Sequence, residues 1–219
     1  MAKKVAVIHT FLYSVEDLKA LFREIVPEVE MVNIIDDSLL KETLAHDQPT
    51  PGVIRRICLY AQQAEAMGAD LILNQCSSVS EVVDIARRMI SIPYLKIDEP
   101  MAEIAVNSGK RIGVVATAHS TIGPSSRLVE STARRLDKEV TVNRCFAEGA
   151  YEALLQENNK PKHDEILMRT IRKACDENEA VILAQGSMMS LLEKTKDMGV
   201  PVLCSLRTGV EQIRKAFAL

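Results

Sequence analysis

Short apolar runs alternate with longer amphipathic stretches along the chain, and this pattern predicts strands that alternate with helices. The first strand is expected at residues 5–10 and a second at residues 29–35. Between them, apolar side chains recur at the three- and four-residue spacing of a helix: Val15, Leu18, Leu21, Phe22 and Ile25. The polar segment 36–48 is expected to be a loop or a short helix. Such alternation is typical of a parallel sheet with helices on both faces.

A third apolar run, residues 71–73, leads directly into the polar residues 74–78. Ser78 and Glu81 have capping-box spacing, which predicts a helix beginning at this point. Cys76 would then lie just ahead of a helix N-terminus, where free backbone N–H groups and the helix dipole stabilise a thiolate. This placement predicts a thiol pKa lowered from about 8.5 to roughly 3.5–7.5. An inert buried thiol is the alternative interpretation of a single cysteine.

The second half of the chain repeats the plan of the first. Residues 112–117 can be laid over residues 5–10, and residues 180–187 over residues 70–77, which places Gly186 at the position of Cys76. In each half a helix and a proline-led strand follow, at Pro93 and Pro201. Unrelated strands of similar composition are the alternative, since α/β segments resemble one another.

We therefore predict an α/β fold with two similar Rossmann-like halves, residues 1–109 and 110–219. Their parallel sheets are expected to be related by a pseudo-twofold axis, with the active site in the cleft between them. The last helix is expected to pack back on the first half.

Composition narrows the class of protein. The 219 residues are 47% hydrophobic, with 27 basic and 30 acidic side chains and a formal charge of −3. No block of like charge indicates binding to nucleic acid or to a membrane surface. The five cysteines lack CxxC spacing and are odd in number, which favours reduced thiols over a disulfide framework or a metal site. A soluble cytoplasmic protein is expected.

Polar residues follow the predicted strands of both halves. Ligands of parallel sheets bind beyond the carboxyl ends of the strands, so these side chains are expected to line the site. They are His9, Thr10, Asn74, Cys76, Ser77, Ser78, Thr117, Thr121, Gln185, Gly186 and Ser187. Neutral hydroxyl, amide and thiol groups beside helix N-termini suit a small carboxylate. Serine and threonine at such junctions also serve as helix caps, so a structural role stays open for each.

Four motifs together resemble the aspartate/glutamate/hydantoin racemase family over nearly the whole chain. They are Asn-Gln-Cys-Ser-Ser at 74–78, Asp-Glu-Pro-Met at 98–101, Gly-Val-Val-Ala-Thr at 113–117 with Thr121, and Leu-Ala-Gln-Gly-Ser-Met at 183–188. The resemblance implies an enzyme without cofactor, in which one cysteine from each half moves a proton at the substrate's α-carbon from opposite faces. Cys76 matches the first of these cysteines. A small carboxylate substrate and a homo-oligomer are also implied.

The second cysteine of the family is missing, because Gln185, Gly186 and Ser187 stand where it is expected. Racemisation by two bases needs an acid/base group on each face of the carbanion, and an amide or a glycine cannot serve. Ser187, His119 and Cys204 are the candidate replacements. We predict a racemase-like isomerase with Cys76 as the acid/base. A single-cysteine lyase or decarboxylase and a non-catalytic small-anion-binding protein are the alternatives.

Two further expectations concern the surroundings of Cys76. His9 could assist the thiol in the manner of a thiol–imidazole pair. Substrate specificity is expected to depend on residues 11–13 and on the segment 36–50.

Overall fold

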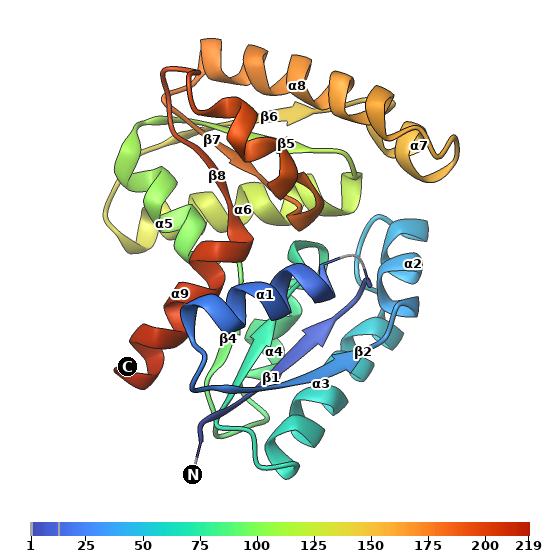
Figure 1. Ribbon diagram of the computed structural model, residues 1–219, viewed down its shortest axis with the longest axis vertical. Helices are drawn as coiled ribbons and strands as arrows, with labels where there is room; N and C mark the ends of the chain where they lie inside the picture. The colour runs from blue at the N-terminus through green and yellow to red at the C-terminus, as the bar shows by residue number, and fades with distance from the viewer. Residues whose placement is uncertain (1, 13) are drawn as a thin grey trace. The chain divides into compact units, whose positions relative to one another are not determined.

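The computed structural model describes residues 2–12 and 14–219 (Figure 1). The chain forms two compact units, Met1–Asp98 with Leu206–Leu219, and Glu99–Ser205. Each unit holds one four-stranded sheet, with strand orders β2-β1-β3-β4 and β6-β5-β7-β8, and every strand pair is parallel. The predicted α/β fold with two parallel sheets is confirmed. The division after residue 109 and the arrangement of the two halves stay predictions.

The first unit alternates strands and helices as the hydrophobic pattern predicts. Its elements are β1 (Lys4–His9), α1 (Val15–Ile25), β2 (Glu30–Ile35), α2 (Ser38–Ala45), α3 (Pro51–Ala66), β3 (Leu71–Asn74), the 3₁₀ turn η1 (Ser77–Val79), α4 (Val82–Ala86), β4 (Tyr94–Lys96) and the last helix α9 (Ser205–Phe217).

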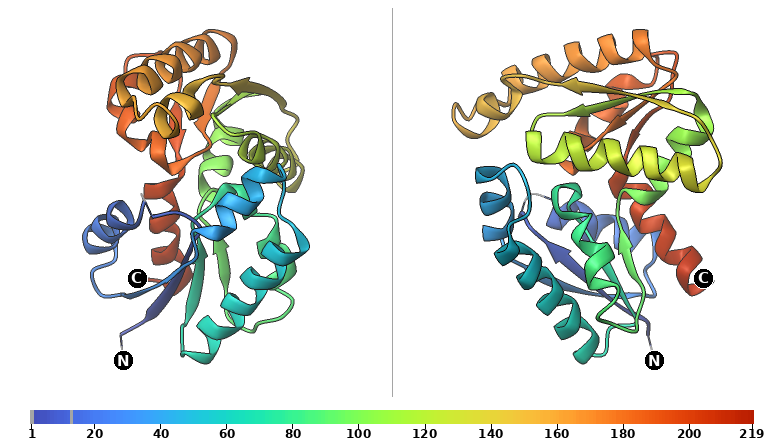
Figure 2. Two further views of the ribbon diagram at one scale, coloured as in Figure 1. Left: turned by 90° about the vertical axis from the view of Figure 1, so that its right-hand side faces the viewer. Right: turned by 180° about the vertical axis from the view of Figure 1, so that it is seen from behind.

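The sheet of the first unit is covered by helices on both faces. The view on the left of Figure 2 shows α1 and α9 on one side of this sheet and α3 on the other. On the α3 face, Ala6, Ile8 and Ile72 are fully buried against α3 and α4. Helix α9 is held to the unit by polar contacts as well, since Gln212 Nε2 donates to the Lys96 carbonyl oxygen at 2.9 Å.

The helices that flank this sheet begin at residues with different capping chemistry. Thr50 precedes Pro51 in an extended conformation, and its Oγ1 accepts a hydrogen bond from the Val53 amide at 3.2 Å. Ser14 stands ahead of α1 but makes no side-chain cap hydrogen bond. The Thr50 side chain therefore caps the N-terminus of α3, whereas the Ser14 side chain does not cap α1.

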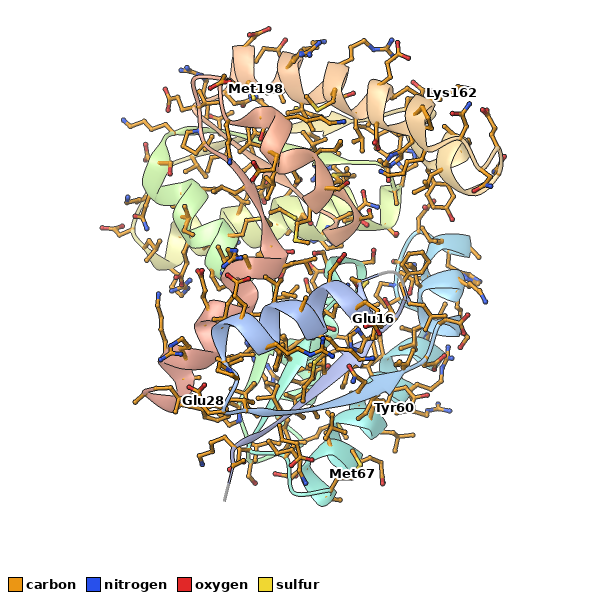
Figure 3. All side chains as sticks on the ribbon, in the orientation of Figure 1. Glu16, Glu28, Tyr60, Met67, Lys162 and Met198 are labelled. Atoms are coloured by element: carbon orange, nitrogen blue, oxygen red, sulfur yellow. The ribbon has the colours of Figure 1, made fainter. Side chains whose placement is uncertain are left out.

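The polar segment after β2 folds as the short helix α2 and is tied to α3 by a network of charged groups. Arg56 pairs with Asp36 at 3.2 Å and also with Glu42. Tyr60, labelled in Figure 3, donates a hydrogen bond to Asp36 Oδ2 at 2.8 Å. The network fixes α2 at the carboxyl end of β2.

The second unit follows the same alternation. Its elements are α5 (Glu99–Ser108), β5 (Arg111–Ala116), α6 (His119–Arg135), β6 (Thr141–Phe146), α7 (Ala150–Leu155), α8 (Lys160–Glu177), β7 (Ala180–Leu183), the 3₁₀ helix η2 (Gly186–Thr195) and β8 (Val202–Cys204).

Two apolar clusters hold the second sheet. On one face, Ile112, Val114 and Ile182 are buried against α5 and α6. On the other, Val115, Val181 and Leu183 are buried against α7, α8 and η2. The right-hand view of Figure 2 shows this sheet between α6 and α8.

The hydrogen-bond register shows how the two halves correspond. The Gln75 amide donates to the Ile8 carbonyl at 3.2 Å, and the Ala184 amide donates to the Val115 carbonyl at 2.9 Å. β1 and β5 have the same length, and Ile8 and Val115 are each the last residue but one of their strand. The residue after Ala184, Gln185, therefore corresponds to Cys76. The overlay that places Gly186 at this position is wrong by one residue, because it compares residue types and not strand pairing.

Candidate active site

The carboxyl ends of β1 and β3 bring several of the predicted site residues together in the first unit. β1 and β3 are parallel neighbours, with Ile8 opposite Asn74. His9 and Thr10 extend β1 beyond this pair, and Gln75 and Cys76 extend β3. His9, Thr10 and Asn74 are buried, whereas Cys76 is partly exposed.

Polar atoms at this edge are buried without a partner. His9 Nδ1, Asn74 Oδ1 and Gln75 Oε1 make no hydrogen bond to any residue that the structure describes. Leaving a buried polar group unpaired costs about 1–3 kcal/mol, so native proteins keep such groups mainly where a ligand, a water or a functional strain accounts for them. These atoms are concentrated at the ends of two adjacent strands, β1 and β3.

The Cys76 thiol lies in this polar edge, yet its pKa is raised. Burial of the sulfur is the largest cause, and the Thr10 hydroxyl and the Ser78 amide and hydroxyl partly offset it by favouring the thiolate. The Thr10 Oγ1 makes no hydrogen bond of ordinary geometry to any residue that the structure describes. The prediction of a lowered thiol pKa is therefore wrong in its net direction.

The turn after Cys76 explains this outcome. It contains three residues of 3₁₀ helix, Ser77–Val79, and the following helix, α4, has only five residues. So short a helix carries a small dipole, and burial outweighs it. The predicted capping box is also wrong. Ser78 lies inside the turn, and the N-cap of α4 is Glu81, which makes no side-chain cap hydrogen bond.

Asn74 shapes this turn from the end of β3. Its Nδ2 donates a hydrogen bond to the Cys76 carbonyl oxygen at 2.8 Å, across two residues. Ser77 and Ser78 are buried within the turn. The backbone that carries the thiol is thus fixed by local contacts.

His9 is a neutral, buried side chain in this arrangement. Burial lowers the pKa of His9, the hydrogen bond that His9 donates to Asn33 partly opposes this, and nearby Lys19 lowers it further. His9 Nε2 lies 2.8 Å from Asn33 Oδ1, so Nε2 carries the proton and Nδ1 is left as an acceptor. His9 is paired with Asn33, and Cys76 is not among its hydrogen-bond partners.

Sequence reasoning missed two polar residues near the strand ends. Asn33 lies in β2 and orients His9. Lys96 lies in β4 opposite Asn74, is buried, and pairs with Asp84 at 2.8 Å. Asn33 interrupts the apolar run of β2, and Lys96 ends the short strand β4, and these polar positions are the signal that could have found them.

In the second unit, Thr117 and Gln185 form a hydrogen-bonded pair at the ends of β5 and β7. Gln185 Oε1 accepts from the Thr117 amide at 2.7 Å and from Thr117 Oγ1 at 3.0 Å. Thr117 and Thr121 are buried, Gln185 and Gly186 are partly exposed, and Ser187 is exposed. Gly186 and Ser187 open η2, with Gln185 as its N-cap residue.

The three candidates for a second acid/base lie in different surroundings. His119 is exposed and its ring stacks on Phe146, with 4.1 Å between ring centroids. Cys204 is buried in the apolar cluster of β7, β8 and η2, and its sulfur lies 3.9 Å from the Gln185 carbonyl oxygen. Ser187 is an exposed hydroxyl in η2.

Other features of the described chain bear on cofactors and specificity. Within residues 2–12 and 14–219, no three His, Cys, Asp or Glu side chains are grouped so that they could hold a metal ion. No described helix is long and apolar enough to cross a membrane. Of the expected specificity residues, Leu12 is 57% exposed, and Tyr13 lies outside the described residues.

Comparison with known families identifies the fold. The sequence model of the Asp/Glu/Hydantoin racemase family matches residues 12–213. The chain belongs to this family. A search of curated proteins gave no match.

Solved structures of racemases share the fold of this family member. A Thermus thermophilus glutamate racemase in complex with β-chloro-D-alanine is 18% identical, with a TM-score of 0.74 over 99% of this chain and 81% of that one. A Picrophilus torridus aspartate racemase is 15% identical, with a TM-score of 0.72 over 99% of this chain and 94% of that one. A Klebsiella pneumoniae allantoin racemase is 17% identical, with a TM-score of 0.68 over 99% of this chain and 88% of that one. Family and fold together support a racemase-type enzyme.

Proposed function

We propose that this protein is a cofactor-independent enzyme that moves a proton at the carbon next to a carboxylate or carbonyl of a small amino-acid-like or hydroxy-acid substrate. Cys76 is the acid/base in this proposal. The observation that carries it is the group of buried polar atoms on His9, Asn74 and Gln75, without partners among the described residues, beside Cys76, a partly exposed residue whose sulfur is buried. Such atoms gain hydrogen bonds when a polar substrate arrives.

In the proposed step, the Cys76 thiolate removes the α-proton, and the electron pair of the C–H bond moves onto the carboxylate or carbonyl oxygen as an enolate. A thiol with a raised pKa is a stronger base once ionised, which suits abstraction from a weakly acidic carbon. Backbone amides and hydroxyls around Ser77 stabilise the enolate charge.

The substrate class follows from the neutral groups at the strand ends. His9 is held neutral and Asn74 and Gln75 are amides, so recognition relies on hydrogen bonds from and to uncharged groups. The similar structures are racemases of glutamate, aspartate and allantoin, which supports a small, highly polar substrate with an acidic carbon–hydrogen bond.

Solvent-deuterium exchange tests the proposal. The protein is incubated in deuterated water with a panel of amino acids, allantoin and other hydantoin-like compounds, hydroxy acids and malonates, and deuterium at the α-carbon is measured by mass spectrometry. We expect Cys76→Ser to lower exchange by about 10³-fold or more while substrate still binds. Cys145→Ser, a matched change at another partly buried free thiol, is expected to leave the rate unchanged. Equal rates in both variants would reject Cys76 as the acid/base.

A non-catalytic role in binding a small anion is the second candidate. The raised pKa of Cys76 and the amide at position 185 favour it, because both reduce acid/base capacity at neutral pH. It predicts binding of a panel member with no deuterium incorporation. Release of carbon dioxide from a malonate would instead indicate the single-cysteine decarboxylase.

A further inference from the structure

The first unit has a groove between α1 and β2. Its volume is about 340 Å³, within the usual range of roughly 300–1,000 Å³ for sites that bind small molecules. Both elements belong to the same unit, so the groove is formed within that unit alone. Its lining includes Lys19, Phe22 and Arg23 from α1, and Met31 and Asn33 from β2.

The spacing of these residues explains why they line one groove. Lys19, Phe22 and Arg23 have i, i+3, i+4 spacing, so they lie on one side of α1. Met31 and Asn33 are two residues apart in β2, so they lie on one face of the strand. Phe22 is 3% exposed and Met31 is partly buried, which gives the groove an apolar floor.

The polar groups of the groove are hydrogen-bond donors. Lysine and arginine side chains can only donate. Asn33 Oδ1 already accepts from His9 Nε2 at 2.8 Å, which leaves the Nδ2 group of Asn33 as a donor. Lys19 is close enough to His9 to act on it electrostatically, so Lys19 and Asn33 lie toward the same end of the groove.

The acidic residues near the end of α1 are paired with α9. Glu24 pairs with Arg207 at 2.9 Å, and Glu28 pairs with Arg214 at 3.6 Å. Arg23 forms no ion pair with any residue that the structure describes, and no carboxylate is among the described residues that line the groove. The groove therefore keeps a positive charge that an anion would complement.

The ion pair that Lys19 does make leaves it available to a ligand. Its partner is Glu16 at 2.7 Å, and their side chains are 37% and 78% exposed. Exposed pairs of this kind contribute little to stability, so a ligand carboxylate can replace Glu16 at low cost.

We propose that the groove between α1 and β2 is a second ligand site, which binds a small carboxylate that carries a short apolar chain. Lys19, Arg23 and Asn33 donate to the carboxylate, and the chain lies over Phe22 and Met31. The planar guanidinium of arginine suits a carboxylate, and the apolar floor favours a ligand with a hydrocarbon part over a fully hydrated ion such as phosphate. This inference does not depend on the proposed function, because it requires no turnover.

A nuclear magnetic resonance titration of the ¹⁵N-labelled full chain with 3-phenylpropionate tests this proposal. The probe is expected to bind with a dissociation constant of about 1 mM, as suits a ligand of its size. It should shift the backbone amides that line the groove. It should also shift the ring nitrogens of His9, because Asn33 contacts both the ligand and His9.

Two related probes separate the contributions of charge and chain. The neutral 3-phenylpropionamide should bind about 10-fold more weakly, because it loses hydrogen bonds to a charged group. Acetate should also bind about 10-fold more weakly, because it has no apolar chain to bury. Equal affinity for the acid and its amide would overturn the proposed anion site, and equal affinity for acetate would overturn the apolar subsite.

Variants locate the bound probe. Arg23→Gln is expected to weaken 3-phenylpropionate binding about 10-fold, and the variant should fold because Arg23 is exposed. Lys41→Gln is the matched control, because Lys41 pairs with Asp37 on α2 outside the groove and its loss changes the net charge equally. Equal weakening in both variants would indicate only long-range attraction and would overturn the proposal. Shifts confined to Ser77 and Ser78, unchanged by Arg23→Gln, would also overturn it by placing the probe at the thiol turn.

Discussion

The turn after β3 carries a thiol, whereas the turn after β7 carries an amide at the same backbone position. Both turns follow a four-residue buried strand, and both begin a 3₁₀ helix with an extended residue. Each strand is also preceded by a carboxylate that accepts from the backbone at the start of the neighbouring strand: Asp70 from the Lys4 amide and Glu179 from the Arg111 amide. The comparison teaches that the repeat preserves the backbone frame while the chemistry at its end is free to change.

The surroundings of the two turns differ in the unpartnered groups that they bury. The edge of β1 and β3 leaves atoms of His9, Asn74 and Gln75 without partners, whereas Thr117 satisfies the Gln185 oxygen twice. Buried polar groups without partners can form hydrogen bonds to a substrate, whereas polar groups that already have partners are held in a fixed orientation. The first unit is therefore the one in which we place the proton transfer.

The largest effect that separates the two turns is expected in the pH dependence of exchange. Burial raises the pKa of Cys76, so the thiolate fraction at neutral pH is small and grows as pH rises. The rate of α-proton exchange should increase about tenfold per pH unit from pH 6 to at least pH 8.5. A rate that is already constant below pH 7 would show a thiol with a lowered pKa. Since His9 is held neutral, no step near pH 6.5 is expected.

Removal of the two threonine hydroxyls should give effects of intermediate size and of different kinds. Thr10→Val removes a group that favours the Cys76 thiolate, so exchange at neutral pH should fall about tenfold and the pH profile should move to higher pH. Thr117→Val removes one of the two hydrogen bonds that orient Gln185 in the other unit, so the pH profile of exchange should stay in place. Identical changes in both variants would argue against distinct roles for the two turns.

The smallest effects concern helix caps, one in each unit. Thr50→Ala and Asn159→Ala remove side chains that accept hydrogen bonds from the Val53 and Lys162 amides, and each should lower the free energy of unfolding by about 1 kcal/mol. Ser14→Ala is the matched control, because Ser14 makes no cap hydrogen bond, and a change below about 0.5 kcal/mol is expected. Urea unfolding monitored by circular dichroism measures all three. A loss at Ser14 equal to that at Thr50 would contradict the cap assignment.

Local patterns in the sequence were enough to predict most of the strands and helices. The apolar runs at 5–10, 29–35 and 71–73 correspond to β1, β2 and β3 within a residue or so at each end. Thr50 before Pro51 is a local signal at the start of α3, since capping depends on residues three positions apart. β6 was not singled out, because it is a half-buried edge strand that includes Asn143 and Arg144 and has no apolar run.

Contacts between distant residues account for what local patterns could not predict. His9 is oriented by Asn33, 24 residues away, and Gln185 by Thr117, 68 residues away. The net direction of the Cys76 pKa depends on how deeply the sulfur is buried, which neighbouring residues in the sequence do not reveal. The helix after Cys76 is also shorter than its capping pattern suggests.

The sequence by itself determined the α/β alternation, the strand ends that carry polar residues, and the presence of a cysteine in only one of the two repeated motifs. These follow from periodicity, capping and turn chemistry, which act over a few residues. Only the tertiary structure decided that Gln185 is the counterpart of Cys76, and that the oxygen of its amide is bound by Thr117. Both depend on hydrogen bonds between parallel strands, whose register is set when the chain packs and not by any single segment.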